Sequence, residues 1–256
     1  MTTYSLLEVK DPKKLQDLTD YWEPKKEYIE KDLWVIRNFL SKEELVWLNE
    51  QAEDPAGWYP TMRSFYGGNC KNKFLGYVPT YGDDGVMLPP HPKNKPKFIP
   101  VPYIRDIEDR MESVLPKYFS GAGALQSFFE VPDEQILAEL GHDVDYAMPF
   151  HYERDEEDSE EFQKTISVME NGTVRAEALE TAAFNVYIND NFKGGELKFK
   201  NKDYVIKPEP GMLINIPLYK EFEHMVAKVT GGDRHALYGR SFSNLEDRHM
   251  SSREDC

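Results

Sequence analysis

The stretch from Phe184 to Ser241 is a succession of short alternating segments separated by turn-forming residues. Phe184–Asn189 and Glu196–Phe199 carry apolar and β-branched residues at a period of two, which is the pattern of half-buried strands. The intervening Asn191–Gly195 has the composition of a turn. Two further strand–turn–strand units follow. This pattern predicts a meander of short antiparallel strands, folded as a jelly-roll or cupin-type barrel.

Three side chains of the kind that bind metals accompany this meander: His151 and Glu153 precede it, and His224 lies within it. Side chains at i and i+2 of a strand point to the same face, so His151 and Glu153 can hold one ion together. A second strand would bring His224 to the third position. Two imidazoles and one carboxylate on one face of an ion leave the other face open, as in non-haem Fe(II) oxygenases. Taken alone, His-x-Glu is common, and either histidine also fits a structural or surface role.

Several short motifs surround these candidate ligands in a fixed order. They are His151-x-Glu153, Tyr187-Ile188-Asn189-Asp190, Gly194-Gly195-Glu196-Leu197, Lys207-Pro208-Glu209-Pro210-Gly211, and His224 followed by Arg234. Their order and spacing over about residues 136–243 resemble the 2-oxoglutarate- and Fe(II)-dependent oxygenases, in the prolyl 4-hydroxylase-like branch. The resemblance implies a double-stranded β-helix fold, mainly β within an α+β class, braced by N-terminal helices.

The resemblance also implies two cofactors, Fe(II) and the co-substrate 2-oxoglutarate. It places Arg234 on the distal C5 carboxylate of 2-oxoglutarate, where a guanidinium matches a carboxylate through two parallel hydrogen bonds. Tyr187 would donate a second hydrogen bond, and Leu197 would supply an apolar wall. Asn185 shares the face of Tyr187 by strand alternation and is a further candidate for the pocket. A packed core tyrosine and a surface ion pair of the arginine are the alternatives for Tyr187 and Arg234.

The implied reaction is hydroxylation of a C–H bond with release of succinate and CO2, with proline in a peptide or protein as the substrate. A small-molecule or free amino-acid hydroxylase of the same class is the nearest alternative. A non-catalytic sensor that binds metal or 2-oxoglutarate, and a structural interaction module without metal, are the alternatives from other classes.

Two positions depart from the pattern of this branch. The carboxylate is Glu153, where most members of the branch carry aspartate. Arg240 stands where many of them carry an aromatic residue, on the same strand face as Arg234, and is a candidate for contact with the substrate.

Three other residues compete for a place at the metal. Asp155 is an alternative carboxylate, but a straight strand would carry it about 13 Å from His151. His142 is an alternative ligand only if the strand begins elsewhere. His235 alternates to the opposite face from Arg234, and we expect it to be no ligand.

Length and charge are consistent with one large domain. The chain has 256 residues and a formal net charge of −15, which argues against nucleic acid or an anionic membrane as partner. Two cysteines and no long apolar run predict a cytoplasmic protein. We expect a single domain over residues 1–256, with supporting helices and loops in 1–130, the barrel core in 131–243 and a polar tail in 244–256. The oligomeric state is left open.

Local signals predict several elements outside the meander. Ser41-Lys42-Glu43-Glu44 is a capping box that begins a helix over Ser41–Ala52. Apolar residues at helical spacing predict a second helix over Tyr103–Phe119. Further expectations are a short helix in residues 1–30, strands over Asp32–Phe39, Phe128–Val131 and Gln135–Leu140, substrate-covering loops over Trp58–Pro102, and an acidic insertion over 154–181 that contains a hairpin.

Overall fold

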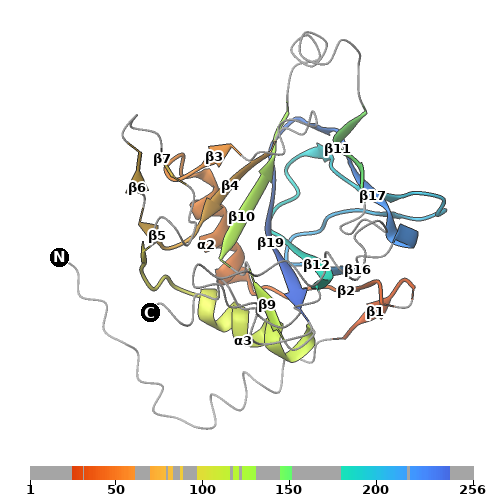
Figure 1. Cartoon of the computed structure of the whole chain (residues 1–256), viewed down its shortest axis with the longest axis horizontal. Coiled ribbons are helices and arrows are strands. Elements are labelled where there is room, and N and C mark those ends of the chain that lie inside the picture. The colour runs from red at the N-terminus through yellow and green to blue at the C-terminus, as the bar shows by residue number, and fades with distance from the viewer. Residues whose placement is uncertain are drawn as a thin grey trace, which may run out of the picture.

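The computed structural model describes residues 25–30, 32–60, 70–78, 80–82, 87–88, 97–115, 118–120, 123–130, 145–151, 180–217 and 220–242. Within these ranges the chain is built mainly of antiparallel strands, with two α-helices against one side (Figure 1). No helix in the described part is long and apolar enough to cross a membrane.

A large antiparallel sheet forms the centre of the molecule. Among the described residues its strands lie in the order β1-β2-β16-β12-β19-β10-β4-β3, and β9 also pairs with β19. Their bounds are β1 Glu27–Tyr28, β2 Trp34–Ile36, β3 Tyr59–Pro60, β4 Cys70–Phe74, β9 Tyr118–Ser120, β10 Ala124–Phe128, β12 Glu180–Tyr187, β16 Leu213–Pro217 and β19 Arg234–Phe242. The long strands β12 and β19 are neighbours at its middle, and each contributes buried apolar side chains on both faces of the sheet.

A smaller antiparallel sheet faces the large one (Figure 1). Its order is β11-β17-β14-β15, with bounds β11 Tyr146–His151, β14 Leu197–Phe199, β15 Val205–Ile206 and β17 His224–Ala227. The remaining described elements are three two-stranded ribbons and one 3₁₀ turn. They are β5 Tyr77–Val78 with β8 Lys97–Phe98, β6 Thr80–Tyr81 with β7 Met87–Leu88, β13 Lys193–Gly194 with β18 Val229–Thr230, and η3 Lys220–Phe222.

Alternation along the central strands separates two apolar cores. On β12, Phe184 and Val186 point to one face, and Ala183 and Tyr187 point to the other. The first face packs against the helices α2 Lys42–Glu53 and α3 Ile104–Val114. The second face packs against the small sheet. The mainly β, jelly-roll-like fold braced by helices is therefore confirmed as three layers: helices, large sheet and small sheet.

The N-terminal helix begins as its sequence predicts. The Ser41 hydroxyl accepts from the Glu44 backbone N–H at 3.2 Å, and the Glu44 carboxylate accepts from the Ser41 N–H at 2.7 Å. The predicted helix over Tyr103–Phe119 is too long at its C-terminal end, because it stops at Val114 and β9 follows. Leu115 precedes a proline, which disfavours helical backbone at that position.

Two strand expectations need correction. The strand expected over Phe128–Val131 is found at Ala124–Phe128 instead. The Trp58–Pro102 stretch, expected as loops, contains β4, which pairs with β10 inside the large sheet. Residues 1–130 therefore supply strands of the main sheet as well as supporting helices. The helix in residues 1–30, the strand over 135–140, the acidic insertion and the tail fall wholly or largely outside the described residues.

Candidate functional site

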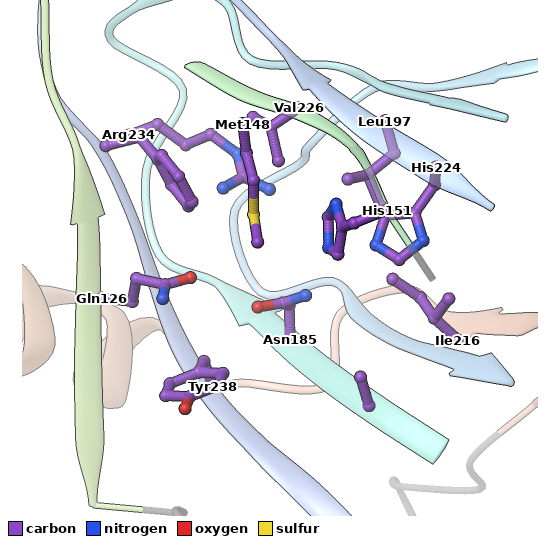
Figure 2. A pocket seen from close by; sticks show the side chains of 12 residues that line it. Gln126, Met148, His151, Asn185, Leu197, Ile216, His224, Val226, Arg234 and Tyr238 are labelled. Carbon is purple, nitrogen blue, oxygen red and sulfur yellow. The ribbon is translucent and has the colours of Figure 1, made fainter. Parts of the chain in front are cut away.

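Two histidines meet at one end of the small sheet. His151 is the last residue of β11, His224 is the first residue of β17, and the two residues pair directly across these strands. Their ring centroids lie 4.4 Å apart (Figure 2). His224 is 4% exposed, and His151 is partly buried. The structure therefore brings together the two imidazoles that the sequence predicted as ligands of one ion.

Backbone carbonyls fix the tautomer of both rings. His151 Nδ1 lies 2.8 Å from the Pro149 carbonyl oxygen, and His224 Nδ1 lies 3.0 Å from the Phe222 carbonyl oxygen. A carbonyl oxygen can only accept, so each Nδ1 carries the proton and each neutral ring keeps its lone pair on Nε2. Metal-binding histidines are usually held in this way, with one ring nitrogen donating to a carbonyl and the other facing the ion.

The third predicted ligand lies outside the described residues. Glu153 follows the end of β11, and the competing Asp155 and His142 also fall in undescribed stretches. Within the described ranges there is no group of three or more potential metal ligands. The carboxylate position therefore stays a prediction, and the two histidines are the part of the set that the structure describes.

Arg234 brings a buried positive charge into the same pocket. It is the first residue of β19, it is 2% exposed, and its guanidinium carbon lies 5.2 Å from the Phe128 ring centre and 4.8 Å from that of Tyr187. Its Nη2 donates to the Tyr187 hydroxyl at 3.1 Å. Its Nε has no hydrogen-bond partner among the described residues. A buried cation held by neutral groups is costly unless an anion completes its environment.

Tyr187 lies wholly inside the protein and supports the arginine. Its hydroxyl accepts the arginine hydrogen bond and keeps its own proton to donate. Burial raises the pKa of Tyr187, while the positive charge of Arg234 acts in the opposite direction. The phenol therefore stays protonated at neutral pH. The structure thus places it both in the core and in contact with Arg234.

One pocket between the two sheets joins these groups (Figure 2). Among the predicted residues, Asn185 and Leu197 line it together with both histidines and Arg234. Tyr187 reaches it through Arg234 and is not itself among the residues that line it. The residues that sequence reasoning missed are Gln126, Phe128, Met148, Ala183, Ile216, Val226 and Tyr238. A glutamine between the apolar residues of β10 is the sequence signal that could have identified Gln126. The sequence pattern predicts this strand at Phe128–Val131, so the prediction does not include Gln126.

Gln126 is the polar member of the missed set that stands out. It is 6% exposed, and its amide faces the pocket from β10, opposite Asn185 on β12 (Figure 2). The side chain of Met148 projects into the pocket in the same view. The pocket thus combines two imidazoles, one guanidinium and two carboxamides with apolar walls.

The two remaining candidates lie elsewhere on β19. His235 is on the opposite face from Arg234, as alternation predicts, and stacks on Trp58 with ring centres 6.0 Å apart. Burial lowers the pKa of His235 to about 4, with Lys71 adding to the effect and Asp233 opposing it. Arg240 is a strand residue of β19 paired with Ala183, and its contact with substrate stays a prediction.

The residues present fit a divalent metal and a carboxylate-bearing co-substrate. Two imidazoles with their lone pairs on Nε2 suit a borderline metal ion such as Fe(II). A buried guanidinium whose Nε–H has no partner among the described residues suits a carboxylate, which accepts two parallel hydrogen bonds. The histidines and Arg234 line the same pocket.

No protein-family model and no curated protein sequence matches the chain. Solved structures do resemble it. The viral collagen prolyl hydroxylase of Paramecium Bursaria Chlorella virus-1, in complex with 2OG, aligns with a TM-score of 0.40 and 15% identity, over 82% of this chain and 95% of that one. An oxidoreductase of the 2OG-Fe(II) oxygenase family from Burkholderia pseudomallei aligns with a TM-score of 0.44 and 12% identity, over 83% of this chain and 85% of that one. A Pseudomonas putida prolyl-4-hydroxylase aligns with a TM-score of 0.43 and 14% identity, over 84% of this chain and 94% of that one.

Proposed function

We propose that this protein is an Fe(II)- and 2-oxoglutarate-dependent dioxygenase that hydroxylates a C–H bond. One observation carries the proposal: both predicted histidines line the same inter-sheet pocket as a buried arginine whose Nε has no partner in the described part of the chain. A non-catalytic metal site would not need the buried cation, and a simple anion site would not need two histidines that share a tautomer.

Each residue then has a role in the proposed site. His151 and His224 hold the metal through Nε2, with Glu153 as the expected third ligand. Arg234 binds the distal carboxylate of 2-oxoglutarate, and Tyr187 orients the guanidinium. When bound, Fe(II) and 2-oxoglutarate supply an oxidative decarboxylation in which O2 is split between succinate and the substrate, with CO2 released. The protein binds, orients and excludes water from these reactants.

Burial makes the arginine an effective anchor. A hydrogen bond to a charged group contributes about 1.5–3 kcal/mol to stability, and Arg234 is held where competing water is scarce. The rings of Phe128 and Tyr187 restrict the guanidinium, so less conformational freedom remains to be lost on binding. Asn185 and Gln126 add amide groups to the pocket lining, and Leu197 adds an apolar side chain.

The finer proposal is that the substrate is proline in a peptide or protein. It rests on the motif resemblance in the sequence, from His151-x-Glu153 to Arg234. Arg240 remains the candidate for substrate contact. The net charge of −15 supports a neutral or basic partner rather than an acidic one.

The test is anaerobic binding of Fe(II) and 2-oxoglutarate, followed by succinate release when air is admitted. Wild type should bind both and release succinate. His224→Ala should lose the metal, and Arg234→Ala should require far more 2-oxoglutarate. His235→Ala is the matched control, because it removes a histidine next to Arg234 that faces away from the pocket.

The outcomes separate the alternatives. A wild-type protein that binds neither Fe(II) nor 2-oxoglutarate would overturn the proposal. Binding of both without turnover, even with a panel of proline-containing peptides, free amino acids and other small molecules, would indicate a sensor. Succinate release coupled to a free amino acid rather than a peptide would keep the class and change the substrate.

A further inference from the structure

Asn189 follows the end of β12 and lies beside the first residues of β19. The backbone ladder between these strands pairs Tyr187 with Ala236 and ends with a hydrogen bond from the Ile188 N–H to the His235 carbonyl at 3.0 Å. Beyond this point a side chain continues the pairing. Asn189 Oδ1 accepts from the His235 N–H at 2.8 Å, and Asn189 Nδ2 donates to the Asp233 carbonyl at 2.7 Å.

The orientation of this amide is determined by its partners. Nδ2 also donates to Asn191 Oδ1 at 2.5 Å, so both of its protons face acceptors. The oxygen faces an N–H donor. Only a carboxamide satisfies all three groups at this size, because a carboxylate has no proton to donate to the Asp233 carbonyl. Asn189 is 7% exposed, so water cannot easily replace a lost partner.

The two backbone groups that Asn189 holds belong to the residues on either side of Arg234. On its other edge, Arg234 pairs with Phe128 of β10. The start of β19 is preceded by Gly231 and Gly232, both at positive φ, and the Gly231 N–H anchors the chain before Asp233 by donating to the Glu130 carboxylate at 2.7 Å. The backbone of Arg234 is thus fixed from one side by a strand and from the other by one side chain.

We infer that Asn189 is a positioning residue for Arg234 and so sets the affinity for the distal carboxylate of 2-oxoglutarate. This inference rests on the proposed function. Asn189 does not line the inter-sheet pocket. It lines a separate hollow on the other face of the large sheet, together with Trp58 and His235. Any effect of Asn189 on the co-substrate must therefore pass through the backbone of Arg234.

Asn49 provides a matched control. Its amide nitrogen donates to the Leu45 carbonyl at 2.8 Å and to the Ile188 carbonyl at 3.3 Å, and it lines the same hollow as Asn189. Replacing Asn49 removes two hydrogen bonds from a side-chain amide to the backbone. The bonds from Asn189 to the backbone of Asp233 and His235 remain. A merely structural role, or an effect of the added charge alone, predicts that Asn49→Asp and Asn189→Asp behave alike.

The experiment measures anaerobic binding of Fe(II) and of 2-oxoglutarate by calorimetry, with melting temperatures alongside. We expect Asn189→Asp to raise the Kd for 2-oxoglutarate about tenfold, with the Kd for Fe(II) unchanged because the histidines lie on the other sheet. Asn191→Ala, which removes only the acceptor that orients the amide, should change the Kd in the same direction but less. In an Arg234→Ala background, Asn189→Asp should have no further effect, because coupled residues are not additive.

Three results would overturn the inference. The first is an unchanged Kd for 2-oxoglutarate in both Asn189→Asp and Asn191→Ala while wild type binds normally, which leaves the proposed function standing. The second is an equal loss of affinity in Asn49→Asp, which would indicate general loosening or an effect of the added charge. The third is a wild type that binds Fe(II) but no 2-oxoglutarate, which would overturn the proposed function as well.

Discussion

Arg234 donates a hydrogen bond to the hydroxyl of Tyr187 across 3.1 Å, and both side chains are buried on the face of the large sheet that meets the small one. The tyrosine belongs to β12 and the arginine to β19, which are adjacent strands. This contact gives the arginine a fixed partner that carries no charge. The positive charge is therefore held in place, and the tyrosine does not neutralise it, which is what an anion-binding group requires.

Replacing Tyr187 should weaken the binding of 2-oxoglutarate by Arg234. We expect Tyr187→Phe to raise the Kd for 2-oxoglutarate by about tenfold, because a hydrogen bond to a charged group is lost and the guanidinium gains freedom. The phenylalanine ring still packs beneath the guanidinium carbon, so the fold should survive. Calorimetry with 2-oxoglutarate on the Fe(II)-loaded protein under argon checks this. An unchanged Kd would show that Tyr187 is a core residue without influence on the site.

Gly195 is a second position that controls the arginine. A Cβ built at Gly195 would lie 2.8 Å from Arg234 Cδ and 3.0 Å from the Phe192 ring, and its φ is +70°. We expect Gly195→Ala to displace the arginine and reduce affinity for 2-oxoglutarate by tenfold or more, roughly the cost of a small misplacement. Titration of 2-oxoglutarate into the metal-loaded variant gives the Kd.

Gly231→Ala is the control for this change. Gly231 has a similar φ of +62°, but a Cβ there meets nothing closer than 3.9 Å, at Lys193. Both variants carry the same kind of backbone strain, and only one of them crowds Arg234. If the two variants lose affinity for 2-oxoglutarate equally, strain alone explains the loss and the crowding argument is wrong.

The period-two pattern in Phe184–Tyr187 and the order of the histidine and arginine motifs were sufficient to predict much of this site. Alternation put Asn185 on the pocket side and His235 on the other side, and the structure places both there. The face on which a strand residue lies can be predicted from the sequence, because successive side chains of a strand point to opposite faces of the sheet. The pairing of His151 with His224 could not be read from spacing, because it depends on how the two strands align.

Other parts of the fold leave no such signal. Strand β4 has the sequence Cys70-Lys71-Asn72-Lys73-Phe74, which reads as a polar loop. Its Lys73 is nevertheless only 7% exposed, because its amine donates to the Gln51 carbonyl at 2.8 Å and the Asp54 carbonyl at 3.1 Å. Tertiary contacts at the end of α2 thus allow a strand that its own composition does not favour.

Gln126 was missed for a related reason, and its role can be tested. We expect Gln126→Leu to raise the Kd for 2-oxoglutarate several-fold, roughly what one neutral hydrogen bond contributes, because the pocket loses an amide from its lining. Ser127→Ala is the control, since Ser127 is buried on the other face of β10 and its hydroxyl has no partner among the described residues. Binding curves for the two variants should differ. Identical curves would remove Gln126 from the site.

His235 should make stability fall on acidification. Its pKa of about 4 in the folded protein lies below the ordinary value of 6.5, because burial disfavours the charged ring. Between these two values the unfolded chain binds more protons than the folded one, so stability rises with pH across this window. The stabilising contribution is complete above about pH 6.5 and amounts to about 3 kcal/mol, of which about 2 kcal/mol is lost by pH 5.

Urea unfolding of wild type and His235→Phe at pH 7 and pH 5 measures this effect. The phenylalanine keeps a ring against Trp58 but cannot take up a proton. Asp233 and Lys71 remain in both proteins, as does Glu53 in the same hollow, so their own titration cancels in the comparison. We expect the free energy of unfolding to fall by about 2 kcal/mol more in wild type than in the variant over this interval. Parallel pH profiles would mean that the imidazole is open to water in the folded protein.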